Sequence, residues 1–253
     1  MRAAALLPAR LGSTRLPRKM LLSDTGRPLI EHSARNALQT GLFDRVAVAT
    51  DSEEIQAALE AAGIEAVLTR ADHRSGTDRI LEAAQRLDLH DHDVIVNVQG
   101  DEPEVARADL ARLIEVFDEA AGPGVEIATL CTPLDSAEAF ASPQVVKVVR
   151  DGGGDALYFS RAPIPGAGHP GAEGGAAPRL RHIGVYAFRP RALSEFCSLP
   201  VGRLERAESL EQLRWLEAGR KLRVLDAAHA ALGIDTRAEY DAFVARCKAR
   251  VTS

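Results

Sequence analysis

Short apolar segments alternate with helical patterns along the first half of this chain, and this alternation restricts the fold more than any other feature. Strand-like runs occupy residues 3–7, 45–50, 64–68, 93–98 and 125–131. Helical periodicity occupies residues 28–40, a segment that ends near 62, a segment that ends near 87, and residues 106–120. Strands separated by helices of about 10 to 15 residues indicate βαβ units and a mostly parallel sheet, with helices on both faces. The sequence therefore predicts an α/β fold.

The second half of the chain predicts a β-rich arrangement. Strand-like runs at 145–149 and 156–159 flank a run of glycines, which is typical of a hairpin turn. Further strands are predicted at 182–188 and 221–225, and helices at 203–218 and 238–250. The segment 163–178 is rich in Gly, Ala and Pro, and is either an inert linker or a lid. Because no repeat or linker separates the halves, we expect a single domain over 1–253, with a β-rich appendage at about 140–200.

The composition excludes several classes of protein. With 253 residues the chain is long enough to bury a sizeable core. Its net charge is −5, which argues against general nucleic-acid binding. Aromatic residues make up 4% of the chain, too few for a base-stacking platform. The three cysteines lie far apart and form no CxxC pair, so neither a disulfide framework nor a zinc site is predicted.

The apolar segments also bear on location. The run at residues 3–7 is too short for the core of a signal peptide. No apolar run approaches the length of a membrane span. We therefore expect a cytoplasmic protein that does not insert into membranes.

A basic loop follows the first strand-like run and predicts a polyphosphate site. The apolar run stops at Pro8, and the next stretch combines small donor residues with cations: Arg10, Gly12, Ser13, Thr14, Arg15, Arg18 and Lys19. Backbone amides and hydroxyls donate hydrogen bonds to phosphate oxygens, and the cations neutralise the phosphate charge. The Gly-Lys-Ser/Thr ending of the common phosphate loop is absent. A solvated basic loop is the alternative interpretation.

Two aspartates at the ends of other apolar segments are candidate ligands for a hard cation. Asp101 comes after Gly100 and the run at 93–98, and Asp235 follows the turn at Gly233. A carboxylate at a strand end is suited to hold Mg²⁺ against a nucleotide phosphate. Because ligands bind at the carboxyl ends of parallel strands, Asp101 and the basic loop are expected to line the same rim. Helix capping or plain turn formation is the alternative for Asp101, and capping of the last helix is the alternative for Asp235.

Other polar residues support a binding site less directly. Small donors lie at the start of one predicted helix: Ser75, Gly76 and Thr77. They suit an anion or a base edge, although a simple helix cap explains them as well. Glu208, Glu211 and Gln212 are spaced to share a face of the helix predicted at 203–218, which is also compatible with a solvated face. No Ser/His/Asp or Cys/His arrangement stands out, so the pattern favours a transferase whose nucleophile belongs to the substrate.

Together these motifs resemble the 3-deoxy-manno-octulosonate cytidylyltransferase family, also called CMP-Kdo synthetases. The matching stretches extend from the first strand to the last helix: Pro8-Ala-Arg-Leu-Gly-Ser-Thr-Arg-Leu-Pro17 with Lys19, and residues 48–51, 69–77, 95–103, 145–149, 156–162, 181–186, 210–214 and 233–236. The first motif alone also fits the related sialic-acid cytidylyltransferases.

The resemblance implies a fold and a reaction. The fold would be a three-layer α/β/α nucleotide-diphospho-sugar transferase-like fold, with a mostly parallel mixed central sheet and a small β-rich dimerisation appendage. In the Mg²⁺-dependent reaction, the anomeric hydroxyl of Kdo attacks the α-phosphorus of CTP to give CMP-Kdo and pyrophosphate. Kdo is an acidic eight-carbon sugar that is activated in this way for the lipopolysaccharide inner core. CTP and Kdo would be the small-molecule partners, and a homodimer is the expected assembly.

The resemblance also implies roles at the matching positions. The triphosphate would be held by Arg10, Arg15 and Lys19. Cytosine or ribose would be contacted by Ser75 and Gly76. Mg²⁺ would be held by Asp101 and Asp235, which would be catalytic together with Arg10 and Lys19. The sugar pocket would be lined by Gln99, Arg161, His182, Tyr186, Glu211 and Gln212.

Two stretches depart from the family pattern. Gly and Pro usually flank the loop lysine, and here Arg18 and Met20 do so. The segment after Ile164-Pro165 usually carries an aromatic and charged residues, and here it reads Gly-Ala-Gly-His-Pro-Gly-Ala-Glu-Gly-Gly-Ala-Ala, which leaves the acidic sugar open between Kdo, 8-amino Kdo and a sialic acid. A catalytically silent nucleotide-binding protein is the remaining alternative. The joint presence of the two aspartates and the loop cations argues against it.

Overall fold

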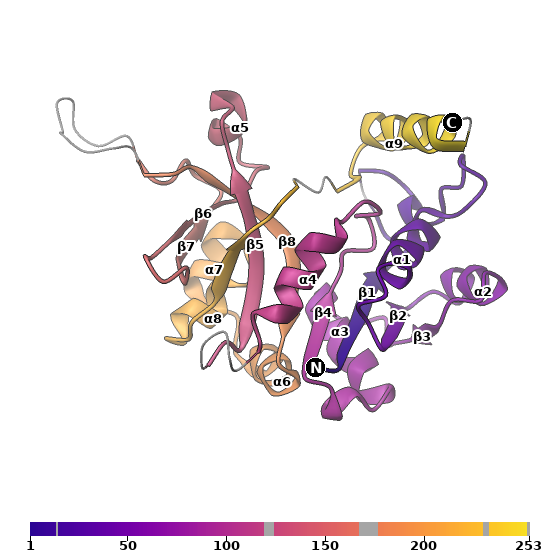
Figure 1. Ribbon diagram of the computed structural model, residues 1–253, viewed down its shortest axis with the longest axis horizontal. Helices are drawn as coiled ribbons and strands as arrows, with labels where there is room; N and C mark the ends of the chain where they lie inside the picture. The colour runs from indigo at the N-terminus through magenta and orange to yellow at the C-terminus, as the bar shows by residue number, and fades with distance from the viewer. Residues whose placement is uncertain (14, 119–123, 167–176, 230–232, 252–253) are drawn as a thin grey trace.

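A mixed β-sheet runs through the centre of the molecule (Figure 1). The computed structural model describes residues 1–13, 15–118, 124–166, 177–229 and 233–251, and within these ranges the sheet has nine strands. They are β1 (Ala3–Ala9), β2 (Arg45–Thr50), β3 (Ala66–Leu68), β4 (Val94–Asn97), β5 (Ile127–Pro133), β6 (Lys147–Arg150), β7 (Ala156–Ser160), β8 (Leu180–Phe188) and β9 (Arg223–Asp226).

The strand order explains how the sheet can be mostly parallel and still mixed. Its main path is β3-β2-β1-β4-β8-β5-β9. β1 is parallel to β2 and β4, and β2 is parallel to β3, as expected for strands that helical crossovers connect. β8 lies antiparallel between β4 and β5, and β9 pairs in parallel with β5. The predicted α/β fold is confirmed.

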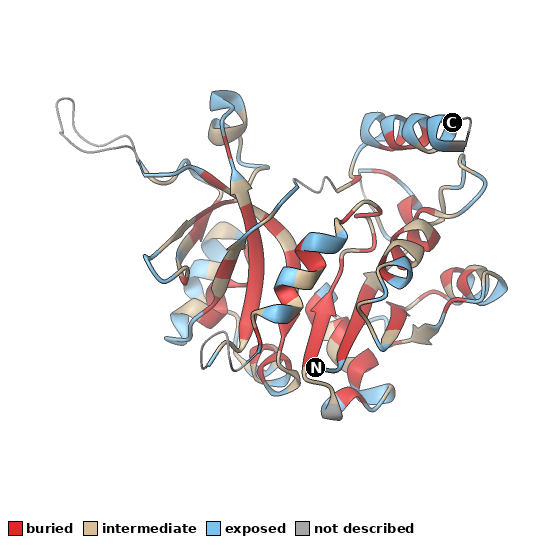
Figure 2. Cartoon of the chain, viewed as in Figure 1, coloured by how far each residue is buried: buried red, intermediate tan, exposed pale blue. Residues whose placement is uncertain are grey.

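Helices cover both faces of the sheet. They are α1 (Leu29–Gln39), α2 (Glu53–Ala61), α3 (Gly76–Arg86), α4 (Arg107–Glu115), α5 (Ala137–Ala141), α6 (Pro190–Ser198), α7 (Arg203–Glu208), α8 (Leu213–Glu217) and α9 (Arg237–Val251), with 3₁₀ turns η1 (Lys19–Leu21) and η2 (Leu89–Asp91). α1, α2 and α4 contribute to one apolar core, and α3, α6 and α8 to the other. In β1, Ala5 and Leu7 join the first core and Leu6 the second, because side chains alternate along a strand. Figure 2 shows the resulting buried central strands.

The last helix, α9, packs beside α1 and over the loop that follows β1 (Figure 1). Leu16 from that loop and Leu29 from α1 form a separate apolar cluster with Tyr240 and Phe243 of α9. The Tyr240 hydroxyl accepts a hydrogen bond from the Asp24 amide at 2.9 Å. This packing brings residues from the end of the chain to the basic loop.

The prediction of one continuous helix over 203–218 is wrong. The chain forms two helices there, α7 and α8, because Ser209 takes a left-handed backbone conformation with φ 52°. Glu208 therefore ends one helix, while Glu211 and Gln212 precede the next, and the three side chains do not share one helical face. α5 and α6 have no counterpart among the predicted elements.

The β-rich appendage consists of the β6–β7 hairpin. β7 pairs with β6, which in turn pairs with the start of β8. β8 lies within the region 140–200 but belongs to the central sheet. Of the Gly-rich segment 163–178, residues 167–176 lie outside the described ranges, and so does Thr14 of the basic loop.

Two further features concern the chain as a whole. The three cysteines, Cys131, Cys197 and Cys247, are free thiols. None of the helices in the described ranges combines the length and the apolar character needed to cross a membrane.

Candidate functional site

A polar cleft of about 340 Å³ opens where the carboxyl ends of β1 and β4 meet. Because these two strands are adjacent and parallel, the loops that follow them share one rim, as predicted. Predicted site residues in the lining are Arg10, Arg15, Lys19, Ser75, Gly76, Gln99, Asp101 and Asp235. These residues come from four separate parts of the chain, which the fold brings together.

Gly100 allows the loop after β4 to approach the end of β1. A Cβ atom at this position would lie 2.8 Å from the Pro8 carbonyl oxygen and 3.0 Å from Ile30 Cδ1. The first of these contacts is with backbone in a central strand, so a side chain here would force the loops apart. The glycine therefore determines how close Asp101 lies to the basic loop.

Lys19 lies between the two candidate metal ligands. Its Nζ donates to Asp101 Oδ2 at 2.5 Å and to Asp235 Oδ1 at 2.9 Å. The Lys19 side chain is 7% exposed, whereas those of Asp101 and Asp235 are 23% and 38% exposed. Burial alone would lower the pKa of Lys19, but the two carboxylates, Asp101 first, raise it above its ordinary value. Lys19 is therefore an ammonium at neutral pH.

Asp235 is not the cap of the last helix. Thr236 caps α9, since its Oγ1 accepts a hydrogen bond from the Glu239 amide at 3.3 Å. Glu239 Oε2 in return accepts hydrogen bonds from the amides of Asp235 and Thr236, both at 2.8 Å. The Ile234 amide donates to the Asp101 carbonyl at 3.0 Å, which ties the two aspartate segments together. The capping alternative for Asp235 is thus wrong, and its carboxylate is free to face the cleft.

The other loop cations divide between the cleft and the outside. Arg15 Nη2 lies 3.0 Å from Asp235 Oδ2. Arg10 lines the cleft without an ion pair to any described carboxylate. Arg18 pairs with Glu54 of α2 and is not part of the lining. Arg18 has a φ of 54°, a left-handed conformation that favours glycine, the residue that the family resemblance leads us to expect at this position.

The loop before α3 supplies Ser75 and Gly76. Ser75 caps α3, since its Oγ accepts a hydrogen bond from the Asp78 amide at 3.0 Å. A Cβ at Gly76 would lie 3.2 Å from Pro8 Cγ, so this helix start packs closely on the end of β1. The capping interpretation of Ser75 is therefore confirmed, and the side chain also lines the cleft. The amides of the first helical turn are suited to a polar ligand edge.

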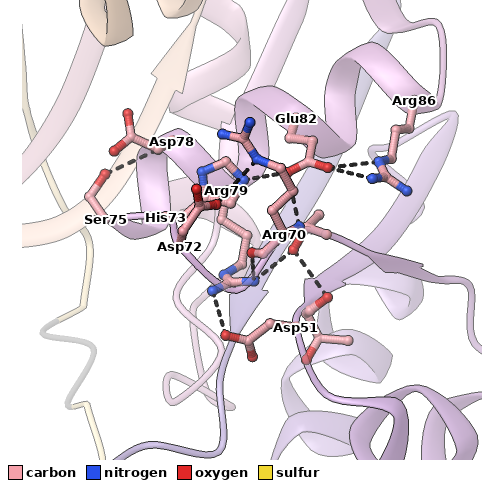
Figure 3. Close-up of polar contacts among 11 residues, drawn as sticks. Asp51, Arg70, Asp72, His73, Ser75, Asp78, Arg79, Glu82 and Arg86 are labelled. Carbon is pink, nitrogen blue, oxygen red and sulfur yellow. Dashed lines mark hydrogen bonds and ion pairs between the residues drawn. The ribbon is translucent and has the colours of Figure 1, made fainter.

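A network of ion pairs holds this loop against α3 (Figure 3). Glu82 accepts hydrogen bonds from His73 Nε2, from the Arg70 amide at 3.1 Å and from Arg86 Nε at 2.9 Å. Burial would raise the pKa of Glu82, but these hydrogen bonds, His73 first, lower it to about 2. The buried Arg79 donates to Asp51 Oδ2 at 2.8 Å and to Thr69 Oγ1 at 2.6 Å. The loop is therefore fixed at both ends by side chains of one helix.

Three residues predicted for the sugar pocket lie on or next to β8. Gln99 Nε2 donates to the Gly184 carbonyl at 3.0 Å. His182 packs edge-on against Phe159, with ring centroids 5.0 Å apart, and its Nε2 lies 3.0 Å from Thr129 Oγ1. Burial lowers the pKa of His182 to about 3, so its ring is neutral. Burial, with a smaller effect of Glu211, raises the pKa of Tyr186 well above its ordinary value.

Three buried polar atoms without a hydrogen-bond partner belong to Asn97 and to the predicted sugar residues Glu211 and Gln212. Asn97 is the register partner of Tyr186 across β4 and β8. Glu211 Oε2 accepts a hydrogen bond from Thr77 Oγ1 at 2.7 Å. Asn97 Oδ1, Glu211 Oε1 and Gln212 Nε2 are buried and have no hydrogen-bond partner among the described residues. Each such atom costs about 1 to 3 kcal/mol unless a ligand or water pairs with it, so this region is suited to a ligand with many hydroxyls.

Arg161 has other partners in the structure. Its Nε donates to the Glu208 carbonyl at 2.9 Å, and its Nη1 donates to the Pro143 carbonyl at 3.0 Å. It does not line the cleft at β1 and β4. The guanidinium thus holds the turn between α7 and α8, and a direct sugar contact by Arg161 stays a prediction.

Several residues that shape the site were not predicted. Asn97 is a polar residue inside an apolar strand, which is a readable signal of a functional position. Glu239 stands three residues after Thr236, the spacing of a capping box. Arg79 and Glu82 carry no such signal, because their partners come from other segments.

Burial, together with Asp101, raises the pKa of Glu102 to about 8, and its Oε2 has no partner among the described residues.

The donor set of the cleft fits Mg²⁺ bound jointly by protein and substrate. Among the described residues, no three His, Cys, Asp or Glu side chains gather closely enough to hold a metal ion. Mg²⁺ usually takes one or two carboxylates together with substrate phosphates. Asp101 and Asp235 both reach the single Lys19 Nζ, so their oxygens already converge on one cation. The pair therefore has the geometry and chemistry for such a site.

Comparisons with known proteins point to one family. Residues 4–222 match the cytidylyltransferase family model. The chain is 49% identical over 240 residues to the 3-deoxy-manno-octulosonate cytidylyltransferase of Anaeromyxobacter sp. (strain Fw109-5), with 95% of this chain and 94% of that protein covered. It is 44% identical over 244 residues to the same enzyme of Syntrophobacter fumaroxidans (strain DSM 10017 / MPOB), with 96% of each covered. A solved structure of CMP:2-keto-3-deoxy-manno-octonic acid synthetase complexed with CTP has a TM-score of 0.89 and 40% identity, covering 99% of this chain and 100% of that chain.

Proposed function

This chain belongs to the 3-deoxy-manno-octulosonate cytidylyltransferase family, and on that premise we propose how its cleft converts CTP and Kdo into CMP-Kdo and pyrophosphate for lipopolysaccharide synthesis. One observation carries the proposal. The carboxylates of Asp101 and Asp235 both contact Lys19 Nζ of the basic loop, at the carboxyl ends of the parallel strands β1 and β4. This is the combination of charges that a metal-bound nucleoside triphosphate requires.

The nucleotide would lie along the basic loop. Arg10, Arg15 and Lys19 would neutralise the triphosphate. Ser75 and Gly76 would contact cytosine or ribose from the start of α3. The network around Arg79 and Glu82 supports this assignment, because a base is discriminated only by a loop that holds its shape.

Asp101 and Asp235 would hold Mg²⁺ against the triphosphate. When bound, this ion would supply positive charge that stabilises the triphosphate and the pyrophosphate leaving group. The chain itself would keep the two carboxylates close, through Gly100 on one side and Glu239 on the other. Their role would be to position the nucleotide rather than to exchange protons.

The sugar would bind beside β8. Gln99, His182, Tyr186, Glu211 and Gln212 would line this pocket, with Asn97 as a further contact. The unpartnered Asn97 and Gln212 atoms suit hydroxyl groups, and the neutral His182 can donate or accept a hydrogen bond. The anomeric hydroxyl would attack the α-phosphorus, the bond to the pyrophosphate oxygen would break, and orientation would supply much of the rate.

Pyrophosphate release from CTP and Mg²⁺ tests the reaction, with Kdo, 8-amino Kdo and a sialic acid offered side by side. We expect turnover with Kdo at the highest kcat/KM. Preference for 8-amino Kdo or the sialic acid would overturn the sugar assignment and keep the reaction. Absence of pyrophosphate release with every sugar would favour the silent nucleotide-binding protein.

Two variants test the assigned roles. Lys19→Ala should cost roughly 3 kcal/mol of barrier, or about 10² to 10³ in rate, because it removes a preorganised charge donor. Turnover within a factor of about three of wild type would contradict that role. Asp235→Asn should weaken Mg²⁺ activation while it leaves the fold intact, and an unchanged magnesium titration would contradict the metal assignment.

The assembly and the location stay predictions. A homodimer through the appendage is supported by β7, which pairs only with β6 within the described ranges, and by Leu157, which is 61% exposed on it. Leu157→Asp should then shift the molar mass in solution from dimer to monomer, as light scattering would measure. The expected location, the cytoplasm, is where CTP is available.

A further inference from the structure

Lys19 has two sets of partners that it cannot satisfy at once. In the structure its ammonium bridges Asp101 and Asp235. The proposed function assigns the same two carboxylates to Mg²⁺ and the same ammonium to the triphosphate of CTP. The relation between the two arrangements therefore rests on that proposed function.

Lys19 Nζ is the cation that the two carboxylates share, while Arg15 pairs with the other oxygen of Asp235. Asp101 Oδ2 and Asp235 Oδ1 lie 2.5 and 2.9 Å from Lys19 Nζ. Mg²⁺ binds carboxylate oxygens at about 2.0 to 2.1 Å, so an ion that uses these same two oxygens competes with the ammonium for them. The ammonium and the ion would then be separated by far less than two cations tolerate. One of them must leave before the other binds.

The Lys19 side chain can leave while its backbone stays in place. The backbone is held by hydrogen bonds from its amide to the Leu16 carbonyl and from the Leu22 amide to its carbonyl, both at 3.2 Å. The four-carbon stem ends in a compact charge that can rotate to a new partner. Since the cleft is also lined by Arg10 and Arg15, the triphosphate would lie within the same set of cations.

We infer that Lys19 is an exchangeable placeholder for the metal ion: its ammonium neutralises the Asp101–Asp235 pair until a divalent cation replaces it, and it then moves to the triphosphate. The exchange conserves favourable charge contacts, because the carboxylates and the ammonium each gain a new opposite charge. Metal and CTP therefore bind cooperatively. The ion alone must displace Lys19 without giving it a new partner, whereas metal with CTP provides that partner.

Manganese binding separates this model from a static site. Mn²⁺ affinity is measured by EPR or calorimetry, with and without CTP and in the absence of any sugar, for wild type and Lys19→Met. Without CTP, Lys19→Met should bind Mn²⁺ about tenfold more tightly than wild type or better, because the competing charge is gone. With CTP the advantage should disappear, because wild-type Lys19 then has the triphosphate as its partner. Lys19→Met should also have a lower Tm than wild type in EDTA, and Mn²⁺ should restore it.

Two further variants complete the design. Arg18→Met removes the neighbouring cation, which pairs with Glu54 outside the cleft, and should leave Mn²⁺ affinity unchanged. Lys19→Gln keeps hydrogen-bond donors without the charge and should behave like Lys19→Met, which covers the case that the methionine variant does not fold.

The outcomes distinguish this inference from the function on which it rests. If wild type binds Mn²⁺ with CTP but neither Lys19 variant binds it more tightly without CTP, the exchange is wrong and the metal site stands. If wild type does not bind Mn²⁺ even with CTP, or if Asp101→Asn leaves its affinity unchanged, the assignment of the carboxylates to the metal is itself wrong.

Discussion

Gly100→Ala tests whether the spacing between the loops after β1 and β4 determines both stability and rate. The added methyl group would lie 2.8 Å from the Pro8 carbonyl oxygen, a backbone atom of β1. Because β1 is hydrogen-bonded on both sides, the strain must be relieved by the loop that carries Asp101. Overpacking of this kind costs about 1 to 3 kcal/mol of unfolding free energy. At this chain length that lowers Tm by about 2 to 10 °C.

The effect on rate follows from the same displacement. A shift of Asp101 by about 1 Å relative to Lys19 should lower kcat by about 10- to 100-fold. Pyrophosphate release at saturating CTP, Kdo and Mg²⁺ measures kcat, and calorimetry measures Tm. Gly152→Ala is the matched control, since a Cβ there would meet no described heavy atom within 4 Å, and it should change neither quantity. Wild-type Tm and kcat in Gly100→Ala would refute the argument that this glycine sets the approach of the two loops.

Three further variants probe the supports of the site. Glu239→Ala should lower the unfolding free energy by about 1 to 2 kcal/mol and raise the Mg²⁺ concentration for half-maximal activity. Glu239→Gln, which keeps an acceptor, should change both quantities less. Equal Mg²⁺ dependence in wild type and the two variants would contradict the positioning of Asp235 by Glu239. Arg18→Gly should be about 1 kcal/mol more stable than Arg18→Ala in urea unfolding, because φ 54° favours glycine, and both should keep the wild-type KM for CTP. Glu82→Gln should be less stable than wild type at pH 7. Since the pKa of Glu82 is lowered to about 2 in the folded state, the stabilisation by its carboxylate is complete above the unfolded pKa of 4.5 and is lost as the pH falls towards 2. The difference in Tm between wild type and Glu82→Gln should therefore narrow over that interval. A constant difference would contradict the role of the carboxylate charge.

The sequence predicts the parallel half of the sheet and the rim of the site well, because both depend on local signals. Apolar runs and helical periods locate β1, β2 and β4, and the carboxyl ends of adjacent parallel strands then bring Asp101 to the basic loop. The family pattern adds Asp235, which lies 216 residues from Lys19 along the chain. The local sequence around Asp235 predicts a helix cap, because the packing of α9 against α1 and the basic loop, which brings Asp235 to the cleft, has no local signal.

The rest could not be predicted, because tertiary contacts decide it. The break between α7 and α8 at Ser209 has no glycine or proline to mark it. The turn is held by Arg161, which bonds to Glu208 at a separation of 47 residues along the chain. The insertion of β8 between β4 and β5 also has no local signal, since strand order depends on packing between distant segments. The sequence also leaves open whether Arg18 affects phosphate affinity or faces solvent, and its contact with Glu54 of α2, outside the cleft, comes from a distant segment.

The path of β8 has a consequence for how such enzymes diverge. Leu180 and Arg181 pair with β6 in the appendage, whereas Tyr186 and Phe188 pair with β4 in the central sheet. The predicted sugar residues of this strand thus lie between a peripheral hairpin and a strand that carries the nucleotide rim. With these residues in the sugar pocket, substitutions in the hairpin are expected to alter the pocket while the loops after β1 and β4 stay unchanged. A change of acidic sugar would then arise at the periphery, without a change at the proposed nucleotide site.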